Sequence, residues 1–358
     1  MPPLLPQALP RLITYYQTHH TVSSGDPISV LPLLQQPDCY LTHVILAAIH
    51  INEDPSGLTL NDHSPSHPRF ETLWAEMRVM QASGVRVLGM LGGAAKGSFE
   101  RLDITAATGT GNGAGAAGDG VDERFERYYG PLRDLVRERA LDGLDLDVEE
   151  PMSLEGIIRL IDRLRADFGP SFLITLAPVA AAMLDAKRNL SGFDYEALEV
   201  MRGREIAWYN TQFYCGWGDC SNPAMYEMML VKGWPAEKIV VGLVTNPKNG
   251  HGWVPWNMLA SVLPVLVGRY PRFGGVMGWE YFNSLPGEES RPWEWAQVMS
   301  TLLRGRRTAV EGSATVEQSV REEAERREAT REVDPDDEKG EGVVPVPNEF
   351  EYHSDGGQ

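Results

Sequence analysis

Apolar runs of strand length recur along the chain and alternate with longer segments that have the pattern of amphipathic helices. Strands are expected at residues 12–16, 43–51, 86–91, 141–148, 172–177, 206–214, 238–244 and 274–281. Helices are expected in most of the intervals, at residues 68–82, 122–138, 154–168, 222–232, 256–270 and 291–303. Eight strands separated by helices close most simply as an α/β fold of the (β/α)₈ TIM barrel type, whose functional groups lie at the carboxyl ends of the strands.

Length and composition fit one barrel followed by a tail. The 358 residues accommodate a barrel of about 250 residues with additions, which we expect to occupy residues 1–307. Residues 308–358 contain 15 acidic and 5 basic residues and few apolar clusters, which predicts a disordered acidic tail. Within this tail, residues 316–332 carry charges at i, i+4 spacing and could form a solvated helix, although they lack an apolar stripe.

The overall charge narrows the class of partner. A formal net charge of −18 argues against nucleic-acid binding, because phosphate contacts need basic patches.

No apolar run reaches the length of about 18 residues that is needed to span a bilayer. The first ten residues lack the pattern of a secretory leader, so a cytoplasmic location is the default expectation, with non-classical secretion left open. We expect a monomer.

The cysteine content agrees with a reducing compartment. Cys39, Cys215 and Cys220 are too few for a disulfide framework, and their number is odd. A disulfide between Cys215 and Cys220 stays open, although free thiols are the favoured interpretation.

The segment from Asp142 to Glu149 carries the most informative chemistry. Its period of two directs Asp145, Asp147 and Glu149 to one face of a strand and apolar side chains to the other. Burying three carboxylates side by side is costly unless a site needs them. At Cα, Asp145 and Glu149 would lie about 13 Å apart, too far to bind one metal ion together. The pattern favours a proton relay in which like charges keep one carboxyl protonated, with Glu149 as the proton donor.

This octapeptide resembles the D-G-x-D-x-D-x-E signature of glycoside hydrolase family 18, the chitinase and endo-β-N-acetylglucosaminidase family. Every fixed position is filled, by Asp142, Gly143, Asp145, Asp147 and Glu149. The resemblance extends over roughly residues 10–305, and its motifs are closest to those of the class III-like plant and fungal chitinases.

The ends of the third and sixth strands carry weaker likenesses to the same family. Gly92 and Gly93 are similar to the end of an S-x-G-G motif, but Met90 stands where a serine is more usual. The glycines could serve a close backbone approach to the lumen or only a tight turn. Gln212 and Tyr214 match the Q-x-Y form of the sixth-strand motif. The glycine-rich residues 105–120 are expected to be a flexible insertion at the rim, and they do not have the pattern of a phosphate loop.

Further substrate-binding candidates lie at other strand ends. The segment 274–281 resembles the family's G-G-x-M-x-W ending, and its Trp279 offers a flat apolar floor for a sugar ring. Trp217 is the best additional aromatic platform among the remaining tryptophans. Tyr15 and Ala177 can line the lumen, although packing in the core is the favoured role for each.

Histidines near these strand ends do not suggest a metal centre. His50, His19 and His20 have no second cluster at ligand spacing beside them, so no metal site is expected.

The resemblance implies a substrate-assisted retaining hydrolysis, because two carboxyls from one strand cannot flank a scissile bond. The substrate's 2-acetamido oxygen would attack the anomeric carbon while Glu149 protonates the leaving oxygen and later activates water. Asp147 would orient the acetamido nitrogen, Asp145 would poise Asp147, and Tyr214 would hold the acetamido oxygen. No metal or organic cofactor is required.

The function expected from the sequence is hydrolysis of β-1,4-linked N-acetylglucosamine polymers, that is, chitin and chitooligosaccharides. An alternative is an endo-β-N-acetylglucosaminidase that cuts the chitobiose core of N-glycans. A second alternative is a chitin-binding lectin without hydrolytic activity, which the intact Glu149 disfavours. The choice between chitin and N-glycans, and between endo and exo action, depends on the conformation of loops, which the sequence pattern does not predict.

Overall fold

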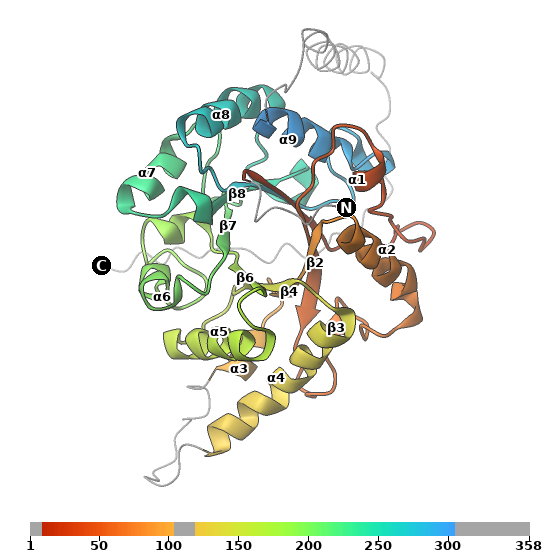
Figure 1. The fold of residues 1–358 in the computed structure, drawn as a ribbon, viewed down its shortest axis with the longest axis vertical. Coiled ribbons are helices and arrows are strands. Elements are labelled where there is room, and N and C mark those ends of the chain that lie inside the picture. The colour runs from red at the N-terminus through yellow and green to blue at the C-terminus, as the bar shows by residue number, and fades with distance from the viewer. Residues whose placement is uncertain (1–8, 104–118, 305–358) are drawn as a thin grey trace, which may run out of the picture. The chain divides into compact units, whose positions relative to one another are not determined.

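A closed barrel of eight parallel strands forms the centre of the protein (Figure 1). The computed structural model describes residues 9–103 and 119–304. The barrel strands are β1 (Arg11–Tyr16), β2 (His43–His50), β4 (Arg86–Gly92), β5 (Gly143–Asp147), β6 (Leu173–Leu176), β7 (Trp208–Gln212), β8 (Ile239–Val244) and β9 (Gly275–Trp279). Each pairs in parallel with the next, and β1 pairs with both β2 and β9, which closes the ring. The predicted TIM barrel is confirmed.

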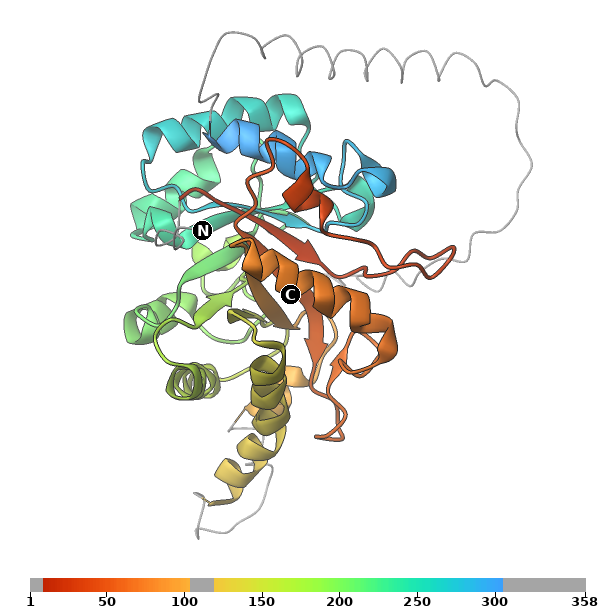
Figure 2. The ribbon, with the colours of Figure 1, turned by 45° about the vertical axis from the view of Figure 1, so that its right-hand side comes forward.

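Helices surround the strands, as Figure 1 shows, and in both views α8 and α9 lie side by side (Figure 2). The α-helices are α1 (Pro32–Gln35), α2 (Glu71–Ala82), α3 (Ser98–Leu102), α4 (Asp119–Arg139), α5 (Leu154–Phe168), α6 (Tyr195–Arg202), α7 (Ala224–Lys232), α8 (Trp256–Arg269) and α9 (Glu294–Arg304). Short 3₁₀ helices are η1 (Pro68–Phe70), η3 (Ala180–Met183), η4 (Ala236–Lys238), η5 (Pro247–Asn249) and η6 (Glu288–Ser290).

The start of α5 illustrates how local chemistry fixes an element. Ser153 precedes the helix in extended conformation, and its side-chain oxygen accepts a hydrogen bond from the backbone N–H of Gly156. This N-cap satisfies one of the helix donors that have no partner within the helix. Asp103 accepts the Ser153 hydroxyl at 2.6 Å and its backbone N–H at 2.7 Å, so the cap is itself anchored to the segment after α3.

The structure differs from the sequence-based expectations mainly at element ends. The expected strands 141–148 and 206–214 are shorter at both ends, since β5 spans only Gly143–Asp147 and β7 only Trp208–Gln212, although the alternation continues beyond them. The strand β3 (Thr59–Leu60), which pairs antiparallel with β2, is too short to give a pattern and was not expected. The expected tail 308–358, with its helix 316–332, lies outside the described residues, as does most of the expected insertion 105–120.

Two apolar layers fill the fold. The larger lies between the strands and the surrounding helices, and the smaller lies inside the barrel. Trp208 forms part of the inner layer near its base: the Arg11 guanidinium lies 4.4 Å from the centre of its ring, and the centre of the His43 ring lies 4.7 Å away. The barrel base is therefore plugged by packed side chains, and the polar groups of the interior lie toward the opposite end.

Replacing Gly143 by alanine tests the fit at the start of β5. A β-carbon there would lie 2.3 Å from the backbone oxygen of Leu173 on β6, which cannot move without disturbing the barrel. We expect Gly143→Ala to lower the free energy of unfolding by about 2 kcal/mol, measured by denaturant titration. Gly268→Ala on α8, where nothing lies within 4 Å, is the matched control and should leave stability unchanged or slightly higher. Equal stability of the two variants would contradict this account.

Candidate active site

The three acids of β5 are brought together at the carboxyl end of the barrel. Asp145 and Asp147 lie on the strand and are buried, and their partners are on strands across the interior. Glu149 follows two residues after the strand ends and is only partly buried. The alternation in the sequence thus predicted the shared face correctly, with Glu149 beyond the strand at its mouth.

Asp145 is the innermost acid and is surrounded by donors. It accepts hydrogen bonds from the Tyr15 hydroxyl at 2.6 Å, the Thr175 hydroxyl at 2.6 Å and the Asn210 amide at 2.9 Å. These donors come from β1, β6 and β7, so the carboxylate ties three barrel strands together. Met90 of β4, its neighbour in the strand register, is a methionine and cannot donate to it.

Gln212 connects the two outer acids. Its Nε2 donates to Asp147 Oδ1 and to Glu149 Oε1, each at 3.3 Å, and to the backbone oxygen of Ala177 at 2.9 Å. The contribution of Ala177 is therefore made by its backbone. Because one nitrogen atom reaches both carboxyls, Asp147 and Glu149 lie close enough to interact strongly.

Burial raises the pKa values of all three acids, and for Asp147 the charges of the other two add to this effect. Desolvation raises the pKa of Asp147 well above its usual value, and the charges of Glu149 and Asp145 raise it further. Burial also raises the pKa of Glu149, opposed by the hydrogen bond from Gln212. For Asp145, burial raises the pKa while the bonds from Thr175, Tyr15 and Asn210 oppose the rise. A proton is therefore held on the outer acids at higher pH than on an exposed carboxyl.

Tyr214 lies beside the acids, and Trp279 packs against the inner apolar group that contains Tyr214. Burial raises the pKa of the Tyr214 hydroxyl well above its usual value, and the nearby charges of Asp147 and Glu149 raise it further, so it stays a protonated donor. Trp279 ends β9 and is only partly buried. Its ring meets Tyr15 edge to face with centroids 5.4 Å apart. Tyr15 itself is fully buried, so its hydroxyl serves Asp145.

The glycine pair after β4 allows a close backbone approach. Gly92 and Gly93 both have positive φ, at 95° and 86°. The Gly93 N–H donates to the backbone oxygen of Asp147 at 2.9 Å, and a β-carbon on Gly93 would lie 3.6 Å from Asp147 Oδ2. Both explanations left open by the sequence hold here, since the turn needs the left-handed conformation and the turn adjoins the carboxylate.

Two buried glutamates that the sequence pattern did not single out shape the mouth of the barrel. Glu280 accepts hydrogen bonds from the backbone N–H groups of Gln17 and Thr18, at 3.1 and 2.8 Å, and from the Thr18 hydroxyl. Glu150 accepts from the N–H groups of Gly97 and Phe99. Each follows a recognised motif directly, by one position after Trp279 or after Glu149, which is the signal that could have found it.

The first two motif residues act at the other end of β5. Asp142 accepts from the Arg86 guanidinium at 2.7 Å, from the Val87 N–H at 2.9 Å and from the Gln81 amide at 2.9 Å. It therefore anchors the start of the strand to β4 and α2, while Gly143 allows the close approach of β6.

Not every candidate is brought to the carboxylates. Trp217 packs against the outer apolar layer, whereas Trp253, a tryptophan that the sequence left unresolved, packs against the inner group that contains Tyr214. Cys215 and Cys220 are free thiols, the first exposed and the second buried. No group of three potential metal ligands gathers within the described ranges. In the same part of the chain, no helix has the length and apolar character needed to cross a membrane.

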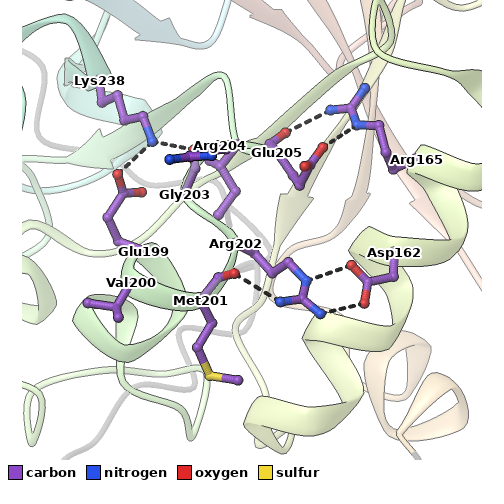
Figure 3. A pocket seen from close by; sticks show the side chains of 11 residues that line it. Asp162, Arg165, Glu199, Val200, Met201, Arg202, Gly203, Arg204, Glu205 and Lys238 are labelled. Atoms are coloured by element: carbon purple, nitrogen blue, oxygen red, sulfur yellow. Dashed lines mark hydrogen bonds and ion pairs between the residues drawn. The ribbon is translucent and has the colours of Figure 1, made fainter.

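A hollow elsewhere on the surface has a different character. It lies between α5, α6 and the end of η4, and six of its charged side chains form three ion pairs (Figure 3). Arg202 pairs with Asp162 at 2.6 Å, Arg165 with Glu205 at 2.7 Å and Lys238 with Glu199 at 2.6 Å. These pairs neutralise six of the charged side chains around the hollow, and none of the β5 acids lines it.

Comparisons with known proteins agree with this geometry. The chain is 55% identical to a chitinase, ChiC, from Aspergillus fumigatus, with a TM-score of 0.70 over 81% of this chain and 98% of that one. It is 48% identical to a fungal endo-β-N-acetylglucosaminidase of glycosyl hydrolase family 18, with a TM-score of 0.77 over 84% of this chain and 100% of that one. The chain is 27% identical to Chitinase 2 of Rhizopus oligosporus over 217 residues. This match covers 58% of the present chain and 36% of the length of that relative.

The family model of the glycosyl hydrolases family 18 matches residues 11–311, which include every β-strand of the barrel and the complete acidic octapeptide. The chain therefore belongs to glycosyl hydrolases family 18.

Proposed function

We propose that the protein hydrolyses β-1,4-linked N-acetylglucosamine polymers, chitin and chitooligosaccharides, by substrate-assisted retaining catalysis. The observation that carries this proposal is the position of Asp147 and Glu149. Asp147 is the last residue of β5, Glu149 follows it by two positions, and both accept a hydrogen bond from the Gln212 amide. An ordinary retaining glycosidase needs two carboxyls about 5 to 5.5 Å apart on opposite sides of the scissile bond.

The two buried glutamates at the mouth, Glu280 and Glu150, bind neighbouring loop segments through hydrogen bonds. Glu150 accepts one backbone N–H with each carboxylate oxygen, whereas Glu280 accepts two backbone N–H groups with Oε2 and the Thr18 hydroxyl with Oε1. Because both oxygens of each carboxyl are occupied, neither is available as a nucleophile. In this arrangement the nucleophile is supplied by the substrate, and the 2-acetamido group of N-acetylglucosamine provides a carbonyl oxygen at the right distance from its own anomeric carbon.

The roles follow from position and protonation. Glu149 lies at the mouth with a raised pKa, so it can protonate the leaving glycosidic oxygen and afterwards take a proton from water. Asp147 accepts a hydrogen bond from the acetamido N–H. It thereby stabilises the positive charge that develops on this nitrogen when the acetamido oxygen bonds to the anomeric carbon. The Tyr214 hydroxyl donates to the acetamido oxygen and orients it for attack, and Trp279 forms the floor on which the sugar ring packs.

Cleavage of the chitobiose core of N-glycans is a second candidate for the same site. It is favoured by the high similarity to the fungal endo-β-N-acetylglucosaminidase, at 48% identity over 84% of this chain. The 55% identity to the Aspergillus fumigatus chitinase favours chitin. Both reactions use an acetamido group next to the scissile bond.

Parallel incubation with chitin oligosaccharides and with a high-mannose glycopeptide separates the two substrates. We expect di- and trisaccharides from the oligosaccharides, identified by mass spectrometry, and no change in the glycopeptide. Release of a glycan that leaves one N-acetylglucosamine on the peptide would assign the second activity instead. Binding without any product would indicate a lectin and contradict hydrolysis.

Replacing Glu149 by glutamine removes the ionisable carboxyl that acts as the proposed proton donor at the mouth of the site. We expect turnover of chitotetraose to fall by about 10²-fold or more, while binding measured by calorimetry is largely retained. Glu155→Gln, an exposed neighbour in the first turn of α5, is the matched control and should keep full activity. Turnover retained by Glu149→Gln would rule out the assigned role.

Replacing Gln212 by leucine removes the N–H that stabilises the ionised forms of Glu149 and Asp147, so the pKa values of both should rise. Because the acid must be protonated to act, the alkaline limb of the kcat profile should move upward by about half a pH unit or more. Thr211→Val, which alters the neighbouring side chain on the opposite face of β7, should leave the limb in place. A downward shift for Gln212→Leu would contradict this reading.

A further inference from the structure

Asp145 is held by donors of two kinds. The hydroxyls of Tyr15 and Thr175 can rotate, so each could accept a hydrogen bond as well as donate one. The amide of Asn210 cannot change its role so easily, because its other end is fixed by the indole of Trp208. Asn210 is therefore the one of these three partners that can only donate to the carboxyl.

We propose that Trp208 and Asn210 form a positioning relay that keeps Asp145 ionised, so that the catalytic proton is carried by Asp147 and Glu149. This inference rests on the proposed function and adds a determinant of its pH dependence. Neither residue touches the substrate in the proposed arrangement, and both act through Asp145.

The orientation of the relay follows from hydrogen-bond chemistry. An indole N–H can only donate, so the Asn210 oxygen that lies 2.9 Å from Trp208 Nε1 must accept. The amide NH₂ group then faces Asp145 Oδ1, also at 2.9 Å. An amide N–H likewise only donates, so this carboxyl oxygen is required to accept. A proton on Asp145 Oδ1 would therefore oppose two donors that point at this same atom, the Asn210 amide N–H and the Thr175 hydroxyl.

The indole itself cannot turn away. Trp208 and Asn210 are both fully buried, and the ring is held between the Arg11 guanidinium, 4.4 Å from its centre, and the His43 ring, at 4.7 Å. Arg11 in turn donates to the backbone oxygens of Glu237 and Gly274 at 2.8 and 3.2 Å. The relay therefore starts from the rigid base of the barrel and ends at the acid trio.

Other titratable groups face Asp145 from several elements. Asp147 and Glu149 follow it on β5, Tyr15 faces it from β1, and Tyr214 lies after β7. The Tyr195 hydroxyl of α6 also feels its charge, and Arg11 and His43 lie beyond Trp208. The tyrosines stay neutral because burial raises their pKa values, and burial lowers the pKa of His43 to about 3, which leaves that ring neutral.

The ionised state of Asp145 has a consequence for its neighbour. The negative charge of Asp145 is one of the causes that raise the pKa of Asp147, after burial and Glu149. Asp147 has no set of donors comparable to that of Asp145, since the Gln212 amide at 3.3 Å is its side-chain partner within the described residues. The proton shared by the trio is thus displaced toward the mouth, where the reaction uses it.

Asn210→Leu removes the donor while it keeps the volume of the side chain. Asp145 should then bind a proton more readily, its charge should be lost near neutral pH, and Asp147 and Glu149 should release their proton at lower pH. We expect the alkaline limb of the kcat profile on chitotetraose to fall by about one pH unit, opposite in sign to Gln212→Leu, with KM changed less than about twofold. Thr211→Val, on the same strand, is the control and should keep the wild-type profile.

A second variant covers the case in which Asn210→Leu does not fold. Trp208→Phe keeps an aromatic ring between Arg11 and His43 and removes only the N–H that fixes the amide. It should shift the limb in the same direction by a smaller amount. A wild-type limb in the folded variants, or an upward shift, would overturn the relay.

A spectroscopic measurement keeps this test separate from that of the function. The ¹³C resonance of the Asp145 side-chain carboxyl, assigned with Asp145→Asn, should show the ionised shift in the wild type between about pH 6 and pH 8 and should titrate in that window in Asn210→Leu. A protonated carboxyl in the wild type would overturn the inference even if hydrolysis is normal. Absence of hydrolysis with the expected resonances would instead contradict only the proposed function.

Discussion

Three carboxyl groups lie side by side at the carboxyl end of the barrel, where burial raises the pKa of each, and the rest of the site depends on this constraint. Moving a charge out of water is costly, and like charges increase the cost. The hydrogen-bond donors are distributed unequally among the three carboxyls. Asp145 accepts three side-chain hydrogen bonds, whereas Asp147 and Glu149 share the amide of Gln212. A proton is therefore retained on the outer pair, where it can be transferred to a leaving group.

The two ends of the barrel contribute in different ways. At the base, Arg11, Trp208 and His43 pack tightly and fix the inner layer. At the mouth, polar side chains hold the backbone around the site: the buried Glu280 accepts hydrogen bonds from the segment after β1, and the side chains of Thr245 and the partly buried Asn249 donate to the backbone oxygen of Trp279. This separation of a stabilising end from a reactive end is general for (β/α)₈ barrels, and here Asn210 connects the two.

Much of the site could be predicted because its residues lie within short motifs. The period of two in β5 placed Asp145, Asp147 and Glu149 on one face, and the same rule placed Gln212 beside Tyr214 after β7. The partners of Glu280 and Asn210 could not be assigned in this way. Each of these two is one polar residue whose partner is distant in sequence, such as Thr18 at a separation of 262 positions or Asp145 at 65. Strand β3 was missed because two residues are too few for a periodic pattern.

The sequence by itself determined which elements form and which side chains share a face, because strand alternation and helix periodicity are local properties of the chain. It also determined the family, through eight consecutive residues. Only the closed barrel decided which polar groups meet across the interior, because closure brings β1, β6 and β7 to one carboxylate. The protonation pattern of the three acids depends on those contacts and on burial, and both exist only in the folded protein.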